Sequence, residues 1–155
     1  MVHTEAPTAT GGPGAEIWTA DPVAPYIPPT ITTPITVVIE FTVDGDGVVP
    51  GTGVAGDLYV PFDCTISAAV IQSTLTGDVE IDVWAAPFVV NTPPTITDSI
   101  VASAPPTLSS AQSSINTTLI GWVIDIPAGT ALRFNINSIA TVTRFTLSLV
   151  ATFTN

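Results

Sequence analysis

The sequence predicts an all-β protein: a single antiparallel jelly-roll β-sandwich of about eight strands, preceded by an extended, proline-rich N-terminal arm. Three observations support this fold class. Several segments alternate apolar and polar residues with a period of two, which is typical of half-buried strands. Clusters of turn-forming residues separate those segments. No segment has a convincing helical pattern, and short antiparallel strands with turns between them are typical of sandwiches and barrels.

Two parts are expected, an arm over residues 1–34 and a knob domain over residues 35–155. The arm includes "APTATGGPGAEIWTADPVAPYIPPTITTP", whose seven prolines exclude a helix or a regular ladder. We expect this part to be extended or disordered. Its large apolar side chains are Ile17, Trp18, Tyr26 and Ile27. A solvated tail has no reason to carry them, so they either anchor the arm on a neighbouring protein or fold back on their own domain.

Four strands are expected in the first half of the knob. The segment "TVVIEFTV" places Val37, Ile39, Phe41 and Val43 on one face, and the turn-rich loop "DGDGVVPGTG" follows. The segment "DLYVPFDCTISAAVIQS" contains a short strand and a longer one. The fourth strand, "DVEIDVWAAP", alternates most clearly. Its inward residues are Val79, Ile81 and Val83, and its outward residues are Asp78, Glu80 and Asp82.

The remaining strands follow a long crossing from Asn91 to Trp122, which has two Pro-Pro pairs and several apolar residues. We expect this crossing to be ordered, with its apolar residues plugging one end of the sandwich or a seam between protomers. The segments "TTLIGWVIDI", "ALRFNIN" and "TVTRFTLSLVATF" predict the last strands. A long crossing after the fourth strand favours a jelly roll. An immunoglobulin-like sandwich is the alternative, although the usual Cys-Trp-Cys framework is missing.

Composition narrows the classes of function. Charged residues make up only 10% of the chain, which has thirteen acidic residues, two arginines, no lysine and a net charge of −11. Binding to nucleic acid or to an anionic membrane depends on lysine and arginine, so neither is expected. The N-terminus does not resemble a secretory signal, and no apolar run is long enough to span a membrane. A surface this poor in charge predicts contact with copies of itself or with a partner protein.

The residue types that usually serve in catalysis and metal binding are scarce in this chain, so neither an enzyme nor a bound cofactor or metal is expected. Cys64 is the only cysteine and His3 the only histidine, which excludes a Ser-His-Asp triad and a multi-histidine zinc site. A buried strand residue is the favoured interpretation of Cys64. The "DGDG" segment lacks the later ligands of a calcium loop and predicts a hairpin turn instead.

Acidic and aromatic side chains remain as candidates for a binding surface. Asp78, Glu80 and Asp82 are expected on a solvated outer face, or paired across the sheet with Arg133 or Arg144. The large aromatic residues expected in the domain core or at a trimer seam are Trp84, Trp122, Phe134 and Phe145. Burial is favoured over a role of the tryptophans as sugar-stacking platforms.

From Gly56 onward the chain resembles a small module of tailed-bacteriophage virion proteins. The similar segments are "GDLYVPFDCTI", "DVEIDVWAAPF", "PPTITDSIVASAPPTLSSAQ" and "TTLIGWVIDIPAGTALRFNINSIATVTRFTLSLV", about 100 of the 155 residues. The proline-rich arm does not match, and the basic residue common after "DVWAAPF" is absent. The resemblance implies a virion protein with a trimeric jelly-roll knob, of the kind found in head decorations, baseplates and tail fibres.

The short arm favours one virion position among these. Extended, ~34 residues reach at most about 110 Å, enough to cross one or two capsid subunits but too little for a fibre shaft. We therefore expect a capsid decoration, or cement, protein on the outer surface of the head, made in the bacterial cytoplasm. Its partners would be two further copies of itself and the major capsid protein, with the arm as anchor. The alternative is a receptor- or glycan-binding head of a tail or head fibre.

Overall fold

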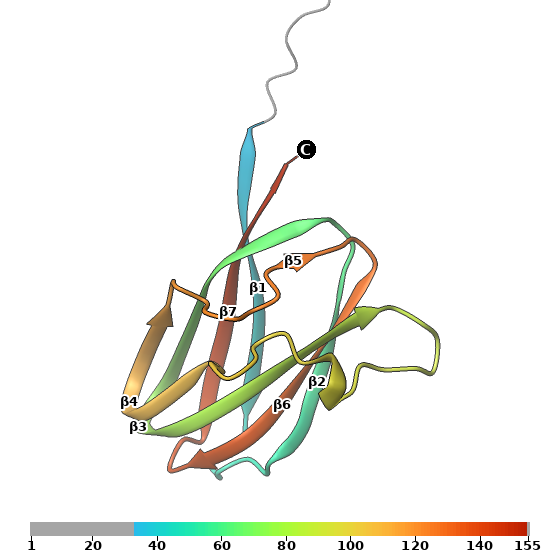
Figure 1. The fold of residues 1–155 in the computed structure, drawn as a ribbon. Coiled ribbons are helices and arrows are strands. Elements are labelled where there is room, and N and C mark those ends of the chain that lie inside the picture. Colours follow the sequence, from blue (N-terminus) through green and yellow to red (C-terminus); the bar gives the residue numbers. More distant parts are fainter. Residues whose placement is uncertain (1–32, 155) are drawn as a thin grey trace, which may run out of the picture. The chain divides into compact units, whose positions relative to one another are not determined.

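The structure is a computed structural model and describes residues 33–154. Seven strands and one short 3-10 helix follow one another in this part of the chain: β1 (Pro34–Asp44), β2 (Gly53–Val60), β3 (Cys64–Pro87), η1 (Ile96–Asp98), β4 (Thr107–Asn116), β5 (Asp125–Ile126), β6 (Thr130–Ala140) and β7 (Arg144–Thr154). Every strand pair is antiparallel. The predicted fold class, an all-β antiparallel sandwich of the jelly-roll type, is confirmed (Figure 1).

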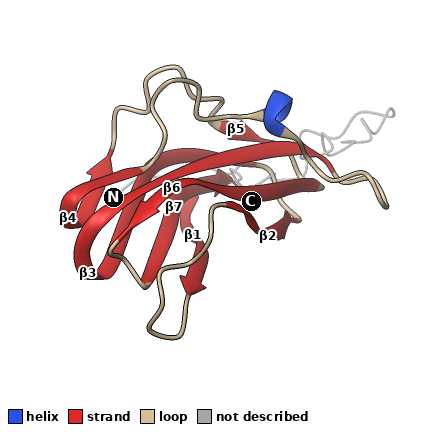
Figure 2. Ribbon diagram, turned by 90° about the horizontal axis from the view of Figure 1, so that it is seen from below, coloured by secondary structure: helices blue, strands red, loops and turns tan. Residues whose placement is uncertain are grey.

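One long strand, β3, joins the two layers of the sandwich. The strand order is β1-β7-β3-β6-β2, with β4 and β5 also paired to β3. The first half of β3 pairs with β7 and the second half with β6, so the sheet curls over on itself (Figure 2). Gly77 lies between the two halves, where a Cβ atom would be 2.5 Å from the carbonyl oxygen of Ala140. A side chain there would push β3 away from the neighbouring strand.

The core lies between the two layers and follows the predicted alternation. The largest fully buried side chains come from the inward positions of β3, β6 and β7, together with one residue of β4: Ile66, Ile71, Val79, Ile81, Val83, Leu108, Leu132, Phe134, Ile136, Phe145, Leu147 and Leu149. The inward residues of β1 are only partly buried, because β1 is the last strand of its layer. Burial of this apolar surface is the main force that closes the sandwich.

The strand boundaries differ from the predicted ones in three places. The two strands expected over residues 64–73 and 78–87 are one continuous strand, β3. Residues 107–116 form β4, although they lie inside the expected crossing. Residues 117–126, expected as a strand, are paired only at Asp125–Ile126. Left-handed backbone at Leu119 (φ 46°) and Gly121 (φ 77°) interrupts the extended conformation there.

The crossing from Asn91 to Trp122 is ordered, as predicted, and several of its own apolar side chains hold it. Those that enter the core are Ile100, Val101, Leu108, Leu119 and Trp122. The Trp122 Nε1–H group also donates to the carbonyl oxygen of Ala104 at 2.9 Å. Asp98, the only charged residue of the crossing, accepts a 2.8 Å hydrogen bond from the backbone N–H of Thr95 before η1. Three apolar side chains of the crossing point outward instead, Ile96, Ile115 and Ile120.

The expected arm lies almost entirely outside the described residues. This applies to its proposed anchors Ile17, Trp18, Tyr26 and Ile27, and to His3. Pro34, the last residue of the expected arm, is the first residue of β1 and pairs with Thr154 of β7. Within residues 33–154, no helix has the length and apolar character needed to cross a membrane.

Candidate functional site

The outer face of the β2–β6–β3 layer carries several polar side chains that the strand pairing brings together. Partners in antiparallel strands point to the same side of a sheet. Arg133 of β6 therefore lies between Asp57 of β2 and Trp84 of β3. In the next outward row, Asn135 of β6 is opposite Asp82 of β3. Segments far apart in the sequence thus build one polar face.

A bidentate ion pair joins β2 to β6 on this face. Arg133 Nε donates to Asp57 Oδ1 at 2.6 Å, and Arg133 Nη2 donates to Asp57 Oδ2 at 2.8 Å. The hydrogen bonds from Arg133 lower the pKa of the Asp57 carboxyl below its ordinary value, and the same contact raises the pKa of Arg133. The arginine side chain is 19% exposed and the aspartate side chain 49% exposed. Asp57 therefore stays ionised and keeps unused lone pairs toward solvent.

Of the three acidic residues of β3 expected on a solvated outer face, Asp78 is exposed, Glu80 is half-buried and Asp82 is buried. Asp78 accepts from the backbone N–H of Ser110 at 2.8 Å, and Glu80 accepts from Asn137 Nδ2 at 3.0 Å. Asp82 is buried and accepts from Ser99 Oγ at 2.6 Å, so the expectation that it lies on a solvated face is wrong. Its burial results from the crossing, whose Ser99 pairs with β3 at Trp84.

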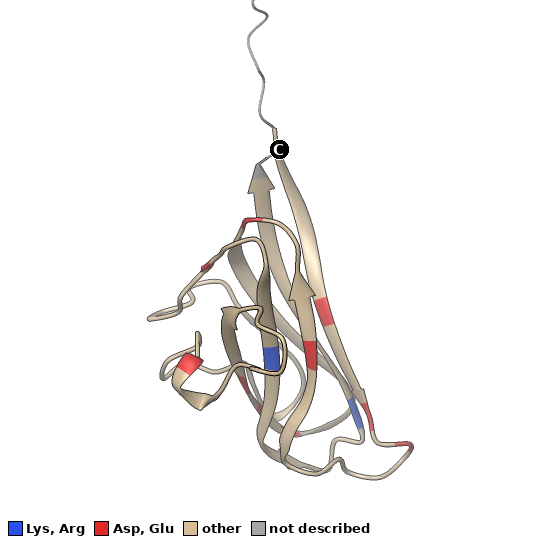
Figure 3. Ribbon diagram, turned by 90° about the vertical axis from the view of Figure 1, so that its right-hand side faces the viewer, with Lys and Arg blue, Asp and Glu red and all other residues tan. Residues whose placement is uncertain are grey.

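The predicted pairing of these acids with the two arginines is also wrong. Arg133 binds Asp57. Arg144 Nε lies 3.7 Å from Asp44 Oδ2, at the end of the β1–β7 pair opposite Pro34 and Thr154. Figure 3 shows the acidic residues spread over strands and loops, with the two arginines on separate strands. Each acid of β3 accepts a hydrogen bond from a group other than an arginine.

A hollow of about 260 Å³ opens beside the ion pair. We call it the outer-sheet hollow. It is lined by Asp57, Ala131 and Arg133 of the sheet and by Phe88, Val89, Asn91, Thr92, Pro93 and Pro94 of the following loop. A tight turn shapes this loop, since Thr92 N–H donates to the Val89 carbonyl at 3.0 Å and Asn91 is left-handed (φ 61°). Pattern analysis of the sequence missed this site, because Asp57 and Arg133 are 76 residues apart.

The rim of the outer-sheet hollow exposes aromatic and aliphatic side chains. The rings of Tyr59 and Phe88 meet edge to face with centroids 5.5 Å apart. Phe88, Val89 and Val90 form a consecutive run, 56%, 56% and 70% exposed. Three successive exposed apolar residues are costly on a soluble surface unless they contact something. The run was visible in the sequence after "DVWAAP", but only the structure shows that it points to solvent.

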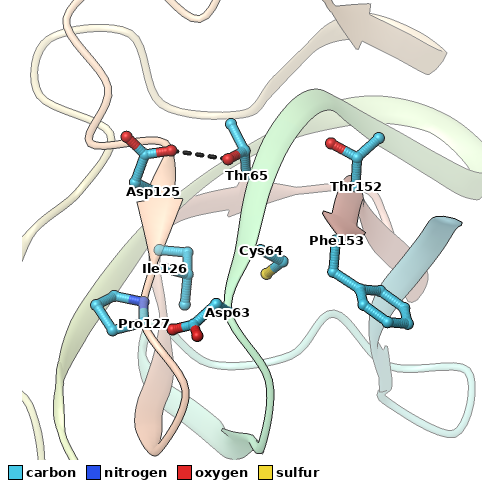
Figure 4. A pocket seen from close by; sticks show the side chains of 8 residues that line it. All are labelled: Asp63, Cys64, Thr65, Asp125, Ile126, Pro127, Thr152 and Phe153. Carbon is cyan, nitrogen blue, oxygen red and sulfur yellow. Dashed lines mark hydrogen bonds between the residues drawn. The ribbon is translucent and has the colours of Figure 1, made fainter. Parts of the chain in front are cut away.

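A second hollow, about 340 Å³, lies at the end of the sandwich beside Cys64 (Figure 4). Thr65 Oγ1 donates to Asp125 Oδ1 at 2.8 Å, and Asp63 accepts from the backbone N–H of Ala128. Burial, together with the nearby Asp63, raises the pKa of the Cys64 thiol. A thiol kept protonated in this way is a poor nucleophile. The interpretation of Cys64 as a buried strand residue is confirmed.

The "DGDG" segment forms a turn after β1. Asp46 N–H donates to Asp44 Oδ1 at 2.9 Å, and Asp46 and Gly47 are both left-handed. The turn is not part of a β-hairpin, because β1 pairs with β7 and β2 pairs with β6. Among the described residues, no group of three or more His, Cys, Asp or Glu side chains is placed to hold a metal ion.

Of the four large aromatic residues expected in the core or at a trimer seam, Trp122, Phe134 and Phe145 lie in the core, and Trp84 is buried on the outer face of the β2–β6–β3 layer. Phe134 and Phe145 are fully buried, and Trp84 and Trp122 are each 8% exposed. The indole N–H of Trp84, unlike that of Trp122, has no hydrogen-bond partner among the described residues. A contribution of these residues to a seam between protomers stays a prediction.

Comparisons with known proteins show no family membership. No family model matches the chain, and no curated protein matches it. Among solved structures, a chain of turnip yellow mosaic virus is 15% identical, with a TM-score of 0.30 and 88% of each chain covered. A chain from the structure of the infectious bursal disease virus Gx strain is 14% identical, with a TM-score of 0.23, covering 83% of this chain and 43% of that chain. Likenesses at these TM-scores carry no argument about function.

Proposed function

We propose that this protein is a structural component of a virion: a capsid decoration protein whose trimeric knob sits on the head surface and whose arm anchors it to neighbouring major capsid subunits. The proposal starts from the resemblance of residues 56–155 to the phage virion module. It assigns a binding role and no catalysis. Copies that bind only the assembled shell would stabilise it by mass action.

The observation that carries the proposal is that the crossing is packed on the core and also exposes apolar side chains. Buried anchors such as Ile100 and Trp122 fix it to the core, while other side chains of the same segment point to solvent. The exposed ones are Ile96, Ile115 and Ile120, which are 69%, 65% and 74% exposed, and Val123 directly after the segment is 56% exposed. A surface that is already held in place loses little conformational entropy on binding, which favours a protein contact.

The charge of the described surface supports the same role. With only two arginines, both next to aspartates, the knob offers no basic patch for nucleic acid or an anionic membrane. Apolar side chains that stand among few charges are typical of surfaces that bind other proteins. We expect the contacts to be made with capsid subunits and with copies of the same chain.

A receptor- or glycan-binding head of a tail or head fibre is the second candidate function. The outer-sheet hollow favours it, since an ion pair and an exposed aromatic ring meet there in a concave site. Concave sites with a few convergent polar groups are the usual binding sites of small ligands.

Binding of the purified protein to empty, expanded capsids and to host cells separates the two functions. Saturable binding to capsids in multiples of three copies per lattice site, with none to cells, supports decoration by a trimer. Binding to cells or to surface glycans, with capsids left bare, contradicts decoration and supports the receptor-binding head.

A further inference from the structure

We propose that the outer-sheet hollow binds one ring of a neutral sugar, with Asp57 and Arg133 holding adjacent hydroxyl groups and Phe88 contacting the apolar face of the ring. This inference rests on the second candidate function, glycan binding, and does not depend on capsid decoration. The hollow, the ion pair and the exposed ring are three separate observations at one place.

The size of the hollow limits the ligand to one small ring. Pockets for drug-sized molecules enclose roughly 300–1,000 Å³, whereas this hollow has about 260 Å³. Sheet residues form its floor, and the turn-stabilised loop from Phe88 to Pro94 forms its wall. A site on a rigid sheet and a short, hydrogen-bonded turn keeps its shape before the ligand arrives.

The ion pair supplies both hydrogen-bonding partners that a sugar needs. Arg133 uses Nε and Nη2 on Asp57, and its Nη1 group has no partner within residues 33–154. Asp57 is half exposed and accepts one hydrogen bond on each oxygen from Arg133, so further lone pairs remain. A hydroxyl group both donates and accepts. Neighbouring hydroxyls of a sugar can therefore donate to Asp57 and accept from Arg133 at the same time.

Charge selects a neutral ligand over an anionic one. Asp57 already compensates the guanidinium group of Arg133, and the whole chain carries a net charge of −11. A phosphate, sulfate or uronic acid would approach an acidic protein and compete with a bound carboxylate. A purely apolar ligand would leave Asp57 and Arg133 without water or partner, which costs free energy.

The apolar side of the hollow matches the other half of a sugar ring. Phe88 lines the hollow, and Tyr59 holds it edge to face. Pro93 and Pro94 add apolar contacts on the loop side. One face of a hexose presents C–H groups, which gain from contact with an aromatic ring while the hydroxyls reach the ion pair.

The test is an NMR titration of the full-length protein with methyl glycosides of neutral hexoses, and with the methyl glucuronide as the charged counterpart. The Arg133 Nε–H signal and the backbone amides of Asn91 and Thr92 report on the hollow. We expect saturable shifts of these signals with at least one neutral glycoside, at millimolar affinity, and weaker binding of the glucuronide.

Two variants of the same exposed loop make the test specific. Phe88→Ala should weaken binding about tenfold, because it removes the aromatic contact. Val90→Ala is the matched control, since Val90 is 70% exposed and does not line the hollow. Asp57→Asn keeps the shape of the side chain and should also weaken binding.

Several results would overturn the inference: no shift of the Arg133 signal with any neutral glycoside, tighter binding of the glucuronide, or equal effects of Phe88→Ala and Val90→Ala on sugar affinity. Loss of particle binding in both loop variants, with no glycoside shift, would assign the loop to a protein contact and would also overturn it. Because capsid binding is measured separately, a protein that binds capsids and no sugar contradicts this inference and leaves decoration standing.

Discussion

Phe41 of β1 stacks on Phe134 of β6, with ring centroids 4.3 Å apart and ring planes within 4° of parallel. The two strands belong to opposite layers, so this pair joins the layers across the core. Gly56 of β2 leaves room for it, since a Cβ atom at that position would lie 2.7 Å from the Phe41 ring. Closure of the sandwich depends on these three positions together.

We expect Phe134→Ala to lower the free energy of unfolding by about 3–5 kcal/mol, because it removes a fully buried ring and leaves a cavity. Denaturant unfolding followed by tryptophan fluorescence measures the change. Val38→Ala is the control, since Val38 is on the outer face of β1 and 52% exposed, and it should change stability little. Equal effects of the two substitutions would contradict the packing described here.

A second prediction concerns the space at Gly56. Gly56→Ala should destabilise the protein by about 1–3 kcal/mol, because the new methyl group overlaps the Phe41 ring. In a Phe41→Leu background the same substitution should cost less, since the nearest ring atoms are gone. A double-mutant cycle measures this coupling. Purely additive effects would show that Gly56 is needed for another reason.

Trp84 and Trp122 provide a matched pair, because both are 8% exposed and, within residues 33–154, only the indole of Trp122 has a hydrogen bond. Trp122→Phe leaves the Ala104 carbonyl without its donor and should cost about 1–3 kcal/mol more than Trp84→Phe, which breaks no such bond. Thermal and denaturant unfolding of the two variants tests this difference. A larger loss in Trp84→Phe would mean that the indole N–H of Trp84 has a partner in solution.

The Asp57–Arg133 pair predicts a pH dependence of stability. The hydrogen bonds from Arg133 lower the pKa of Asp57 in the folded protein below its ordinary value of 3.8. Its stabilising contribution is therefore present above about pH 4 and is lost as the pH falls through the folded pKa. The Asp57 side chain is 49% exposed and solvent screens the pair, so the contribution should not exceed about 1 kcal/mol.

Comparison of wild type with Asp57→Asn over a range of pH measures this contribution. The difference in unfolding free energy should be constant between mildly acidic and neutral pH and should shrink below pH 3.8. Asp44→Asn is the control, since Asp44 lies 3.7 Å from Arg144 and both side chains are more than half exposed. If the difference in unfolding free energy between wild type and Asp57→Asn grew at low pH, the ion pair would not be what lowers the pKa of Asp57.

Deletion of residues 1–32 tests the proposed role of the arm. The cut falls before Pro34, the first residue of β1, and removes the proposed anchors Ile17, Trp18, Tyr26 and Ile27. We expect a folded knob with unchanged unfolding behaviour that no longer binds particles, measured by co-sedimentation with expanded capsids. Full binding by the truncated protein would place the contact on the knob instead.

The fold class could be predicted from side-chain patterns, but individual strands could be predicted to different degrees. β6 and β7 were predictable because their inward residues, such as Phe134 and Leu147, alternate with polar ones. β4 was not, because "TLSSAQSSIN" buries little and is held by backbone pairing to β3. The sequence predicted two strands where β3 is one. The residues near Gly77 are typical of a turn, but in the structure they form a bend within a single strand.

Alternation along the chain predicts antiparallel strands and identifies which residues of β6 and β7 face the core. Three features follow only from the three-dimensional fold: Arg133 binds Asp57, Asp82 is buried, and Phe88 is exposed beside a hollow. The physical reason is the range of the interactions. Burial of alternate side chains leaves a period within each strand, whereas ion pairs and hollows join residues that are distant in the chain and leave no local pattern.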